Sequence, residues 1–270
     1  MQRIDRTRSI PQAGTRALCV WMAAVAALLL AMLPRINEAD AAEKTIQLGV
    51  PPHGWPPYII VRQDQISGIA VDIVRDIVTR RGFAIKTQHY PEKRAHKMVE
   101  QGKVDAWPDA KEWSETPERF LWTDPMVESE DRLIYRENTP VVFNRIEDLF
   151  GKTIGTHLGY YYPRLERHFE NGSIVRADTH GEPAMLKMLF LGRTDAAVIN
   201  KLVALWVIRS EQDLQQSDFT FSKQIVDRAG YRIMFTRKHE WATFIKDFNT
   251  DLEAMKRDGR LDQILSRYRP

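Results

Sequence analysis

The chain alternates between short apolar segments and amphipathic segments from Thr45 onward, and this order constrains its fold more than any other feature. Thr45–Val50 has the composition of a buried strand, and residues 66–81 carry apolar side chains at helical spacing up to Gly82. The pattern continues with a strand at 84–90, a helix at 93–101 and a strand at 104–107. Because strands alternate with helices, the sequence predicts βαβ units on largely parallel sheets, an α/β fold.

One ten-residue segment of this pattern occurs twice. Residues 97–106 (KMVEQGKVDA) recur as 187–196 (KMLFLGRTDA), with the Lys, Met, Gly, Asp and Ala positions identical. Each copy predicts the end of a helix, a glycine in the left-handed conformation and the start of a strand. The repeat indicates two similar α/β lobes; chance similarity between two glycine-capped junctions is the alternative.

The two lobes are predicted to consist of interrupted sequence. Strand-like segments at 131–136 and 231–236 lie where the chain would cross between them. We therefore expect lobe 1 at 42–138 and 228–270 and lobe 2 at 139–227, each a mainly parallel sheet flanked by helices, joined by two hinge crossings. The remaining predicted elements are strands at 153–156 and 195–199 and helices at 163–171, 183–191, 201–210, 240–257 and 261–268.

The first 41 residues have the pattern of a signal peptide. Four arginines within Met1–Arg16 face a single acid, Asp5, and the apolar run 17–33 follows without a charge. A polar segment then ends in Ala39-Asp-Ala41, the small-x-small pattern of a cleavage site. We expect cleavage after Ala41 and export to the periplasm, with an uncleaved membrane anchor as the alternative.

Removal of this segment changes what the composition implies. The mature chain would have 34 Lys and Arg against 33 Asp and Glu, so bulk positive charge for nucleic-acid binding is absent. The single cysteine, Cys19, lies within the signal peptide, which excludes disulfides, thiol catalysis and cysteine-based metal sites from the mature chain. The seven histidines lack metal-ligand spacing, and no nucleophile elbow or phosphate loop is found. The sequence therefore predicts neither a cofactor nor a metal.

Several short motifs occur in an order typical of one family. They are Gly68-Ile-Ala-Val-Asp72, Gly102-Lys-Val-Asp105, Thr116-Pro-Glu-Arg119 with Trp122-Thr-Asp-Pro125, the segment 148–155 (DLFGKTIG), Gly192-Arg-Thr-Asp195, and 257–268 (RDGRLDQILSRY). Together they resemble the type II periplasmic solute-binding proteins of family 3, which serve polar amino-acid ABC transporters. The resemblance extends from about residue 45 to 268.

The resemblance implies a non-enzymatic, two-lobed clamp that closes on a small ligand. We expect a monomer that captures a small polar, carboxylate-bearing solute, such as an amino acid or a related compound, and delivers it to the membrane permease of an ABC transporter. Nucleic acid is not an expected partner. Two alternatives stay open: an enzyme on the same fold, for example a dehydratase, and a ligand-sensing accessory module.

Arg119 is the leading candidate for ligand binding. Thr116 is predicted to cap a helix that begins at Pro117, so that free backbone N–H groups and the guanidinium could hold a carboxylate. Ser114 would add a hydroxyl to the same anion. The alternative is a surface arginine paired with Glu115 or Glu118.

Further candidates come from aromatic and polar residues near strand ends. Trp55 and Tyr58 lie in a proline-rich loop, where they could form a stacking wall or plug the core. One of Trp107 and Trp113 is expected to face the ligand. The other candidates, each with a structural alternative, are Arg94 near a helix start and, by the resemblance, Tyr160 and Tyr161.

One departure from the family pattern concerns the ligand itself. Relatives that bind amino acids usually hold the ammonium group with an aspartate, and the matching position here is Asn200. Glu92 or Asp109 could replace that carboxylate, or the ligand carries no ammonium group.

Overall fold

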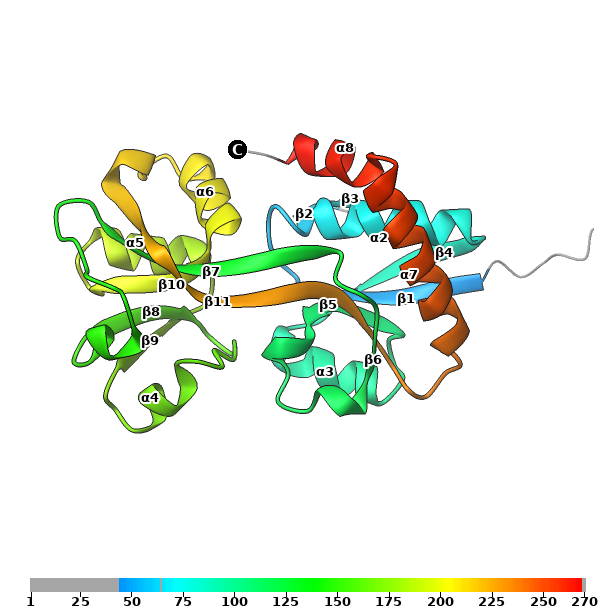
Figure 1. The fold of residues 1–270 in the computed structure, drawn as a ribbon, viewed down its shortest axis with the longest axis horizontal. Coiled ribbons are helices and arrows are strands. Elements are labelled where there is room, and N and C mark those ends of the chain that lie inside the picture. The colour runs from blue at the N-terminus through cyan, green and yellow to red at the C-terminus, as the bar shows by residue number, and fades with distance from the viewer. Residues whose placement is uncertain (1–43, 64, 269–270) are drawn as a thin grey trace, which may run out of the picture. The chain divides into compact units, whose positions relative to one another are not determined.

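A computed structural model describes residues 44–63 and 65–268, and its central feature is one mixed β-sheet (Figure 1). The signal-peptide prediction falls outside these residues. The strands are β1 (Lys44–Val50), β2 (Ile60–Arg62), β3 (Gln65–Ser67), β4 (Phe83–His89), β5 (Ala106–Ala110), β6 (Leu121–Trp122), β7 (Val127–Arg136), β8 (Thr153–His157), β9 (Val175–Thr179), β10 (Ala196–Asn200) and β11 (Phe219–Phe235). The α-helices are α2 (Ile69–Arg80), α3 (Glu92–Glu100), α4 (Glu166–Glu170), α5 (Glu182–Phe190), α6 (Lys201–Ser210), α7 (Ala242–Arg257) and α8 (Arg260–Arg267).

The sheet consists of two parallel halves joined by antiparallel strands, in the order β4-β1-β5-β11-β7-β10-β8-β9. In the first lobe β1 pairs in parallel with β4 and β5, and in the second lobe β8 pairs in parallel with β9 and β10. Figure 1 shows β7 and β11 side by side across the middle. The predicted α/β fold with two lobes and two crossings is confirmed.

The crossing strands are longer than the sequence indicates. β11 has 17 residues, pairs with β7 over its first part and with β5 near its end. A continuous hydrogen-bonded ribbon therefore connects the lobes, where the sequence pattern suggested two short edge strands. The predicted lobe boundary at 138/139 lies just after β7 and the one at 227/228 lies in the middle of β11, and both stay predictions.

The sequence repeat corresponds to the same corner in both lobes. Gly102 and Gly192 have φ angles of 70° and 72°, and both close the preceding helix by donating a backbone hydrogen bond. Asp105 accepts from the backbone N–H of Gln47 at 2.8 Å, and Asp195 accepts from that of Thr153 at 2.7 Å. Each aspartate thus ties a helix-to-strand turn to the first strand of its lobe, which confirms the two similar units.

The amphipathic helix predicted at 66–81 forms, but it begins later. Residues 65–67 belong to a two-stranded hairpin, β2–β3, and α2 begins at Ile69 after Gly68. Gly68 has φ 119°, and a Cβ there would lie 2.5 Å from the carbonyl oxygen of Tyr58. Glycine is therefore required by both conformation and space.

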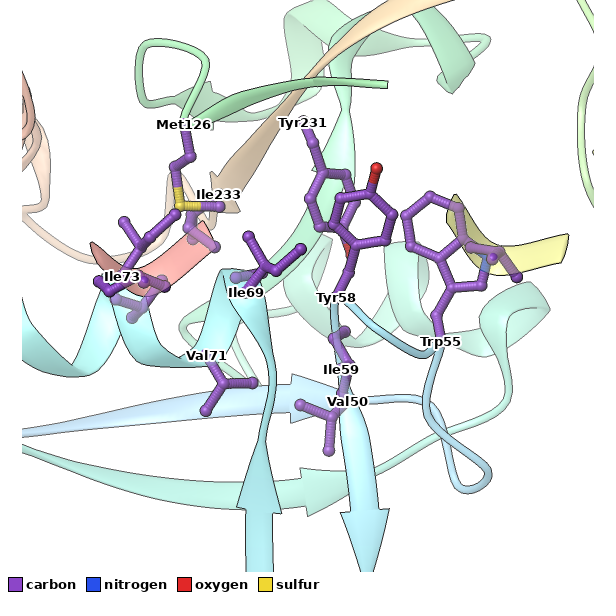
Figure 2. Packing of buried hydrophobic residues seen from close by; sticks show 14 of the residues in the cluster. Val50, Trp55, Tyr58, Ile59, Ile69, Val71, Ile73, Met126, Tyr231 and Ile233 are labelled. Carbon is purple, nitrogen blue, oxygen red and sulfur yellow. The ribbon is translucent and has the colours of Figure 1, made fainter. Parts of the chain in front are cut away.

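The apolar face of α2 packs into the largest core cluster together with the proline-rich loop and the end of β11 (Figure 2). Ile69, Ile73 and Ile77 are at most 2% exposed. Gly68 and Asp72, which belong to one motif, share a partner, because the Tyr268 hydroxyl accepts from the Gly68 N–H and donates to Asp72. The last helix is thereby held against α2.

Within the described residues, no helix is long and apolar enough to cross a membrane. Two shorter differences from the sequence expectations remain. β9 was not predicted, since Val175–Thr179 has alternating polar residues and an exposed edge. A 3₁₀ turn at Pro117–Arg119 stands where the sequence predicts a capped helix.

Candidate functional site

A cavity of about 290 Å³ lies where the strands of both lobes end. Such crevices at the carboxyl ends of parallel strands are the usual ligand sites of open α/β sheets. The first lobe contributes Pro51, Trp55, Ile59, Glu92, His96, Trp107, Pro108, Asp109, Trp113, Glu115, Thr116 and Tyr231. The crossing strand and the second lobe contribute Asp131, His157, Gly159, Tyr160, Tyr161, Tyr162, Glu182, Met185, Val198, Ile199 and Asn200.

Carboxylates dominate the polar lining. Glu92 begins α3 and Glu182 begins α5, so both sit where the chain leaves a strand and enters a helix. Asp131 lies on β7, directly opposite Asn200 of β10. Asp109 on β5 and the exposed Glu115 complete the set. Among the described residues that line this cavity there is no lysine or arginine.

Burial raises the pKa of three of these acids, Glu92, Asp131 and Glu182. For Glu182, burial and the nearby charge of Glu92 raise the pKa to about 7, partly offset by its backbone N–H and by a hydrogen bond with Trp55. For Asp131, burial and then the charges of Asp227 and Glu182 raise the pKa to about 7. Burial also raises the pKa of Glu92. Like charges that share a low-dielectric site disfavour one another's ionised forms.

The two histidines of the lining have opposite environments. Burial alone would lower the pKa of His96, but a 2.6 Å hydrogen bond to Asp109 and the charges of Asp109 and Glu115 raise it. Burial lowers the pKa of His157 to about 4, so its ring is neutral near pH 7. Of these two histidines, His96 is therefore the one whose protonated form is favoured, and its ring is already paired with Asp109.

Aromatic rings form one wall of the cavity. Trp55 stacks on Tyr58 with ring centroids 4.6 Å apart, meets Trp113 edge-on at 5.7 Å and contacts Tyr231 at 5.2 Å. Figure 2 shows the rings of Trp55, Tyr58 and Tyr231 gathered beside Ile59. Both alternatives predicted for the proline-rich loop are found, one for each residue. Trp55 lines the cavity, and Tyr58, 1% exposed, packs in the core behind it.

Asn200 lines the cavity, but its side-chain carbonyl oxygen is engaged in capping a helix. Its Oδ1 accepts from the backbone N–H groups of Leu202 and Val203, which makes it the N-cap of α6. Its Nδ2 donates to Ser129 Oγ at 2.9 Å and to the Tyr58 hydroxyl at 3.3 Å. The second of these bonds connects the two lobes.

Arg119 is not among the residues that line the cavity. Its side chain is 54% exposed and pairs with Glu100 at 3.2 Å. It borders an adjoining surface depression with Lys97 and Lys238, which shares His96, Glu115 and Thr116 with the cavity. The sequence alternative of a surface ion pair describes it better, although the partner is Glu100. Arg94 is exposed and is also absent from the cavity lining.

The predicted capped helix at this point is wrong. Residues Pro117–Arg119 form a single 3₁₀ turn, and Thr116 makes no side-chain cap. Ser114 is buried, and its hydroxyl accepts the Thr116 N–H at 3.3 Å, so it supports the loop. A three-residue turn has too few aligned peptide groups to act as an anion site.

The structure therefore brings together part of the predicted set: Trp55, Trp113, Tyr160, Tyr161 and Asn200 line the cavity, with Tyr58 behind them. Sequence reasoning missed Asp131, His157, Glu182 and Tyr231. For Glu182 a signal existed, because Gly181-Glu182-Pro183 is a helix start directly after β9, but that strand was not recognised. No sequence pattern around Asp131 indicates a binding residue.

Comparison with known proteins places this geometry in context. The sequence profile of the bacterial extracellular solute-binding proteins, family 3, matches residues 46–270. PatH of Vibrio harveyi, provisionally named as an amino-acid ABC transporter-binding protein, is 25% identical over 57% of this chain and 61% of its own length, so the match spans less than two thirds of that relative. The arginine-binding extracellular protein ArtP of Bacillus subtilis is 22% identical over 86% of this chain and 89% of its own.

Among solved structures, the periplasmic binding protein of an arginine transport system from Legionella pneumophila has a TM-score of 0.69 at 21% identity. The superposition covers 84% of this chain and all of that one. At this identity the likeness shows the fold.

Proposed function

This chain belongs to the bacterial extracellular solute-binding proteins of family 3, and we propose that it captures a small polar solute, of amino-acid size, for the membrane permease of an ABC transporter. The observation that carries the proposal is the cavity of about 290 Å³ lined from both lobes at their strand ends. Its volume lies at the lower end of small-molecule sites. Among the relatives named above, PatH is named for an amino-acid ABC transporter and ArtP for arginine binding, which supports the same assignment.

Capture would proceed by hinge closure. Only β7 and β11 carry the chain between the lobes among the described elements, and their pairing register shifts between Phe221 and Asp227. Such irregularities interrupt the ladder and let a strand bend. Closure about this segment would bury the solute and create the surface that a permease recognises in the loaded form. The protein would act as an exported monomer in the periplasm.

The sequence predicts a carboxylate on the solute, but no arginine is among the described residues that line this cavity and could bind it. A carboxylate would have to bind backbone N–H groups of the turn at 159–161 or the His96 ring, which is already paired with Asp109. The proposed solute is still of amino-acid size. The position of Arg119 does not support a role in binding a carboxylate of that solute.

The proposal is tested by native mass spectrometry of the mature protein purified from its own periplasm without denaturation. A small solute bound with one-to-one stoichiometry, released on unfolding and rebound on refolding, is the expected result. Failure to retain or rebind any small molecule, with extracts of the host as the source, would contradict a solute-binding role.

One observation favours a second candidate. Carboxyl groups with pKa values near 7 beside a cavity are typical of general acids and bases, so Glu182 or Asp131 could serve an enzyme on this fold. The same experiment separates the two, because a binding protein returns its solute unchanged after prolonged incubation. Appearance of a product would favour the enzyme.

A further inference from the structure

Three groups in the cavity carry or can carry negative charge without a basic partner in the lining. Glu92, Asp131 and Glu182 have no lysine or arginine beside them there, and the hydrogen bond of His96 goes to Asp109. Other basic side chains near these elements are engaged elsewhere: Arg132 pairs with Glu130, Arg228 with Glu130 and Arg232 with Glu112. A solute without positive charge would leave these carboxylates repelling one another in a poorly solvated space.

The aromatic wall adds a second requirement on the solute. Trp55, Trp113 and Tyr231 present π faces and edges to a cavity that also holds carboxylates. Cations are attracted to aromatic faces, and most strongly where water is excluded. A carboxylate-bearing solute would gain nothing from these rings.

Tyr231 provides an independent sign that a polar ligand group belongs here. It is 3% exposed and lines the cavity, and its hydroxyl has no hydrogen-bond partner among the described residues. Burial raises its pKa well above the usual value, so it remains a neutral hydroxyl that can accept from an N–H donor. A hydroxyl of a cavity-lining residue that has no protein partner is available to a ligand or to water.

From the lining charges, the aromatic wall and the free Tyr231 hydroxyl, we propose that the solute is a small organic cation, recognised through an ammonium or guanidinium group and not through a carboxylate. This rests on the proposed function and specifies its substrate class. Glu182 and Asp131 would meet the cationic group from the side of the second lobe, Glu92 from the first lobe, and Trp55 would cover it. Asn200 would then not be a replacement for an ammonium ligand, since its oxygen is engaged in the cap.

The test compares four small probes by thermal shift and isothermal titration calorimetry. L-arginine carries both groups, agmatine lacks the carboxylate, L-citrulline replaces the guanidinium by a neutral urea group, and succinate has carboxylates alone. We expect agmatine to bind at least as tightly as L-arginine, L-citrulline to bind at least about tenfold more weakly than L-arginine, and succinate to give no shift.

Substitutions of two carboxylates test whether they contact the cationic group. Glu182→Gln and Asp131→Asn should each weaken agmatine binding by about tenfold or more, because each removes a charge from a partly desolvated pair. Glu170→Gln, on the exposed face of α4, is the matched control and should leave binding unchanged. Two variants at independent positions keep the test decisive if one of them folds poorly.

Three results would overturn the inference: weaker binding of agmatine than of L-citrulline, which keeps an α-ammonium and a carboxylate group, the largest shift with succinate, or no shift with either cation. A neutral or anionic solute found by native mass spectrometry would also overturn it while leaving the solute-binding function intact. Loss of the function itself would appear as no retained solute in that separate experiment.

Discussion

At the scale of single residues, ionisation of Glu182 destabilises the fold. The pKa of Glu182 is about 7 in the folded protein against an ordinary 4.5, so the folded state holds a proton that the unfolded state has lost between these pH values. The free energy of unfolding therefore falls as pH rises from about 4.5 to about 7. Since one pKa unit corresponds to about 1.4 kcal/mol, the effect of Glu182 is on the order of 3 kcal/mol at pH 8.

Glu182→Gln should remove this penalty. We expect the variant to unfold at the same urea concentration as the parent near pH 4.5 and at a higher one at pH 8. Comparing the two proteins isolates Glu182 from the groups around it. Among these, Glu92, Asp131 and His96 have raised pKa values and act in the same direction, whereas His157, with its pKa lowered to about 4, acts in the opposite direction below about pH 6.5. A variant less stable than the parent at pH 8 would contradict the assignment.

Asn200 allows a second comparison at this scale. Asn200→Ala removes the cap of α6 and the donor to Ser129 and should cost about 2 kcal/mol in the free energy of unfolding, measured by urea titration. Asn200→Asp keeps the cap oxygen but adds a charge opposite Asp131, so its cost should grow as pH rises above 7. A pH-independent cost for the aspartate variant would show that the two side chains do not interact.

At the scale of elements, the repeated helix-to-strand corner offers a matched pair. Asp105 and Asp195 make the same bond to a backbone N–H, but Asp105 is buried and also contacts His239, whereas Asp195 is exposed. Asp105→Ala should cost about 2 kcal/mol and Asp195→Ala about 1 kcal/mol or less, because an unsatisfied group costs more when water cannot reach it. Equal costs in chemical denaturation would show that burial does not control this bond.

The elements also show how far the sequence leads. Periodicity and glycine positions were sufficient for the helices, and α6 has the predicted bounds of 201–210, since local hydrogen bonding and one apolar stripe determine a helix. β11 was underestimated, because its pairing with β5 and β7 depends on residues more than eighty positions away. The turn at 116–119 failed for a related reason: Ser114 occupies the Thr116 N–H, and Trp122 donates to the carbonyl of Pro117.

Residues of the candidate site could be predicted from the sequence where they follow the end of a recognisable strand. Trp55, Trp113 and Tyr160 were found in this way, and Glu92 was considered as a substitute carboxylate. Asp131 could not be found, since it is polar within a strand and reaches the cavity only because β7 passes between β10 and β11. Arg119 was overvalued because a motif shows which residues occur, whereas the side-chain direction depends on Glu100 across the surface.

At the scale of the whole molecule, two side-chain contacts join the lobes beside the cavity. Asn200 donates to the Tyr58 hydroxyl at 3.3 Å, and Trp55 hydrogen bonds with Glu182. Both connect the proline-rich loop of the first lobe to helix starts of the second. If the lobes close as proposed, these bonds form part of the free-energy difference between the closed and open arrangements.

Tyr58→Phe removes one such bond and keeps the ring that stacks on Trp55. The loss of about 1 kcal/mol from the closed arrangement should weaken binding of the solute by roughly fivefold and raise the radius of gyration of the solute-free protein in small-angle X-ray scattering. Tyr135→Phe, a change of the same kind on β7 at a residue outside the cavity lining, is the control and should alter neither quantity. Weaker binding without expansion would indicate that Tyr58 acts on the cavity wall alone, and unchanged values of both would exclude any contribution of this bond to closure.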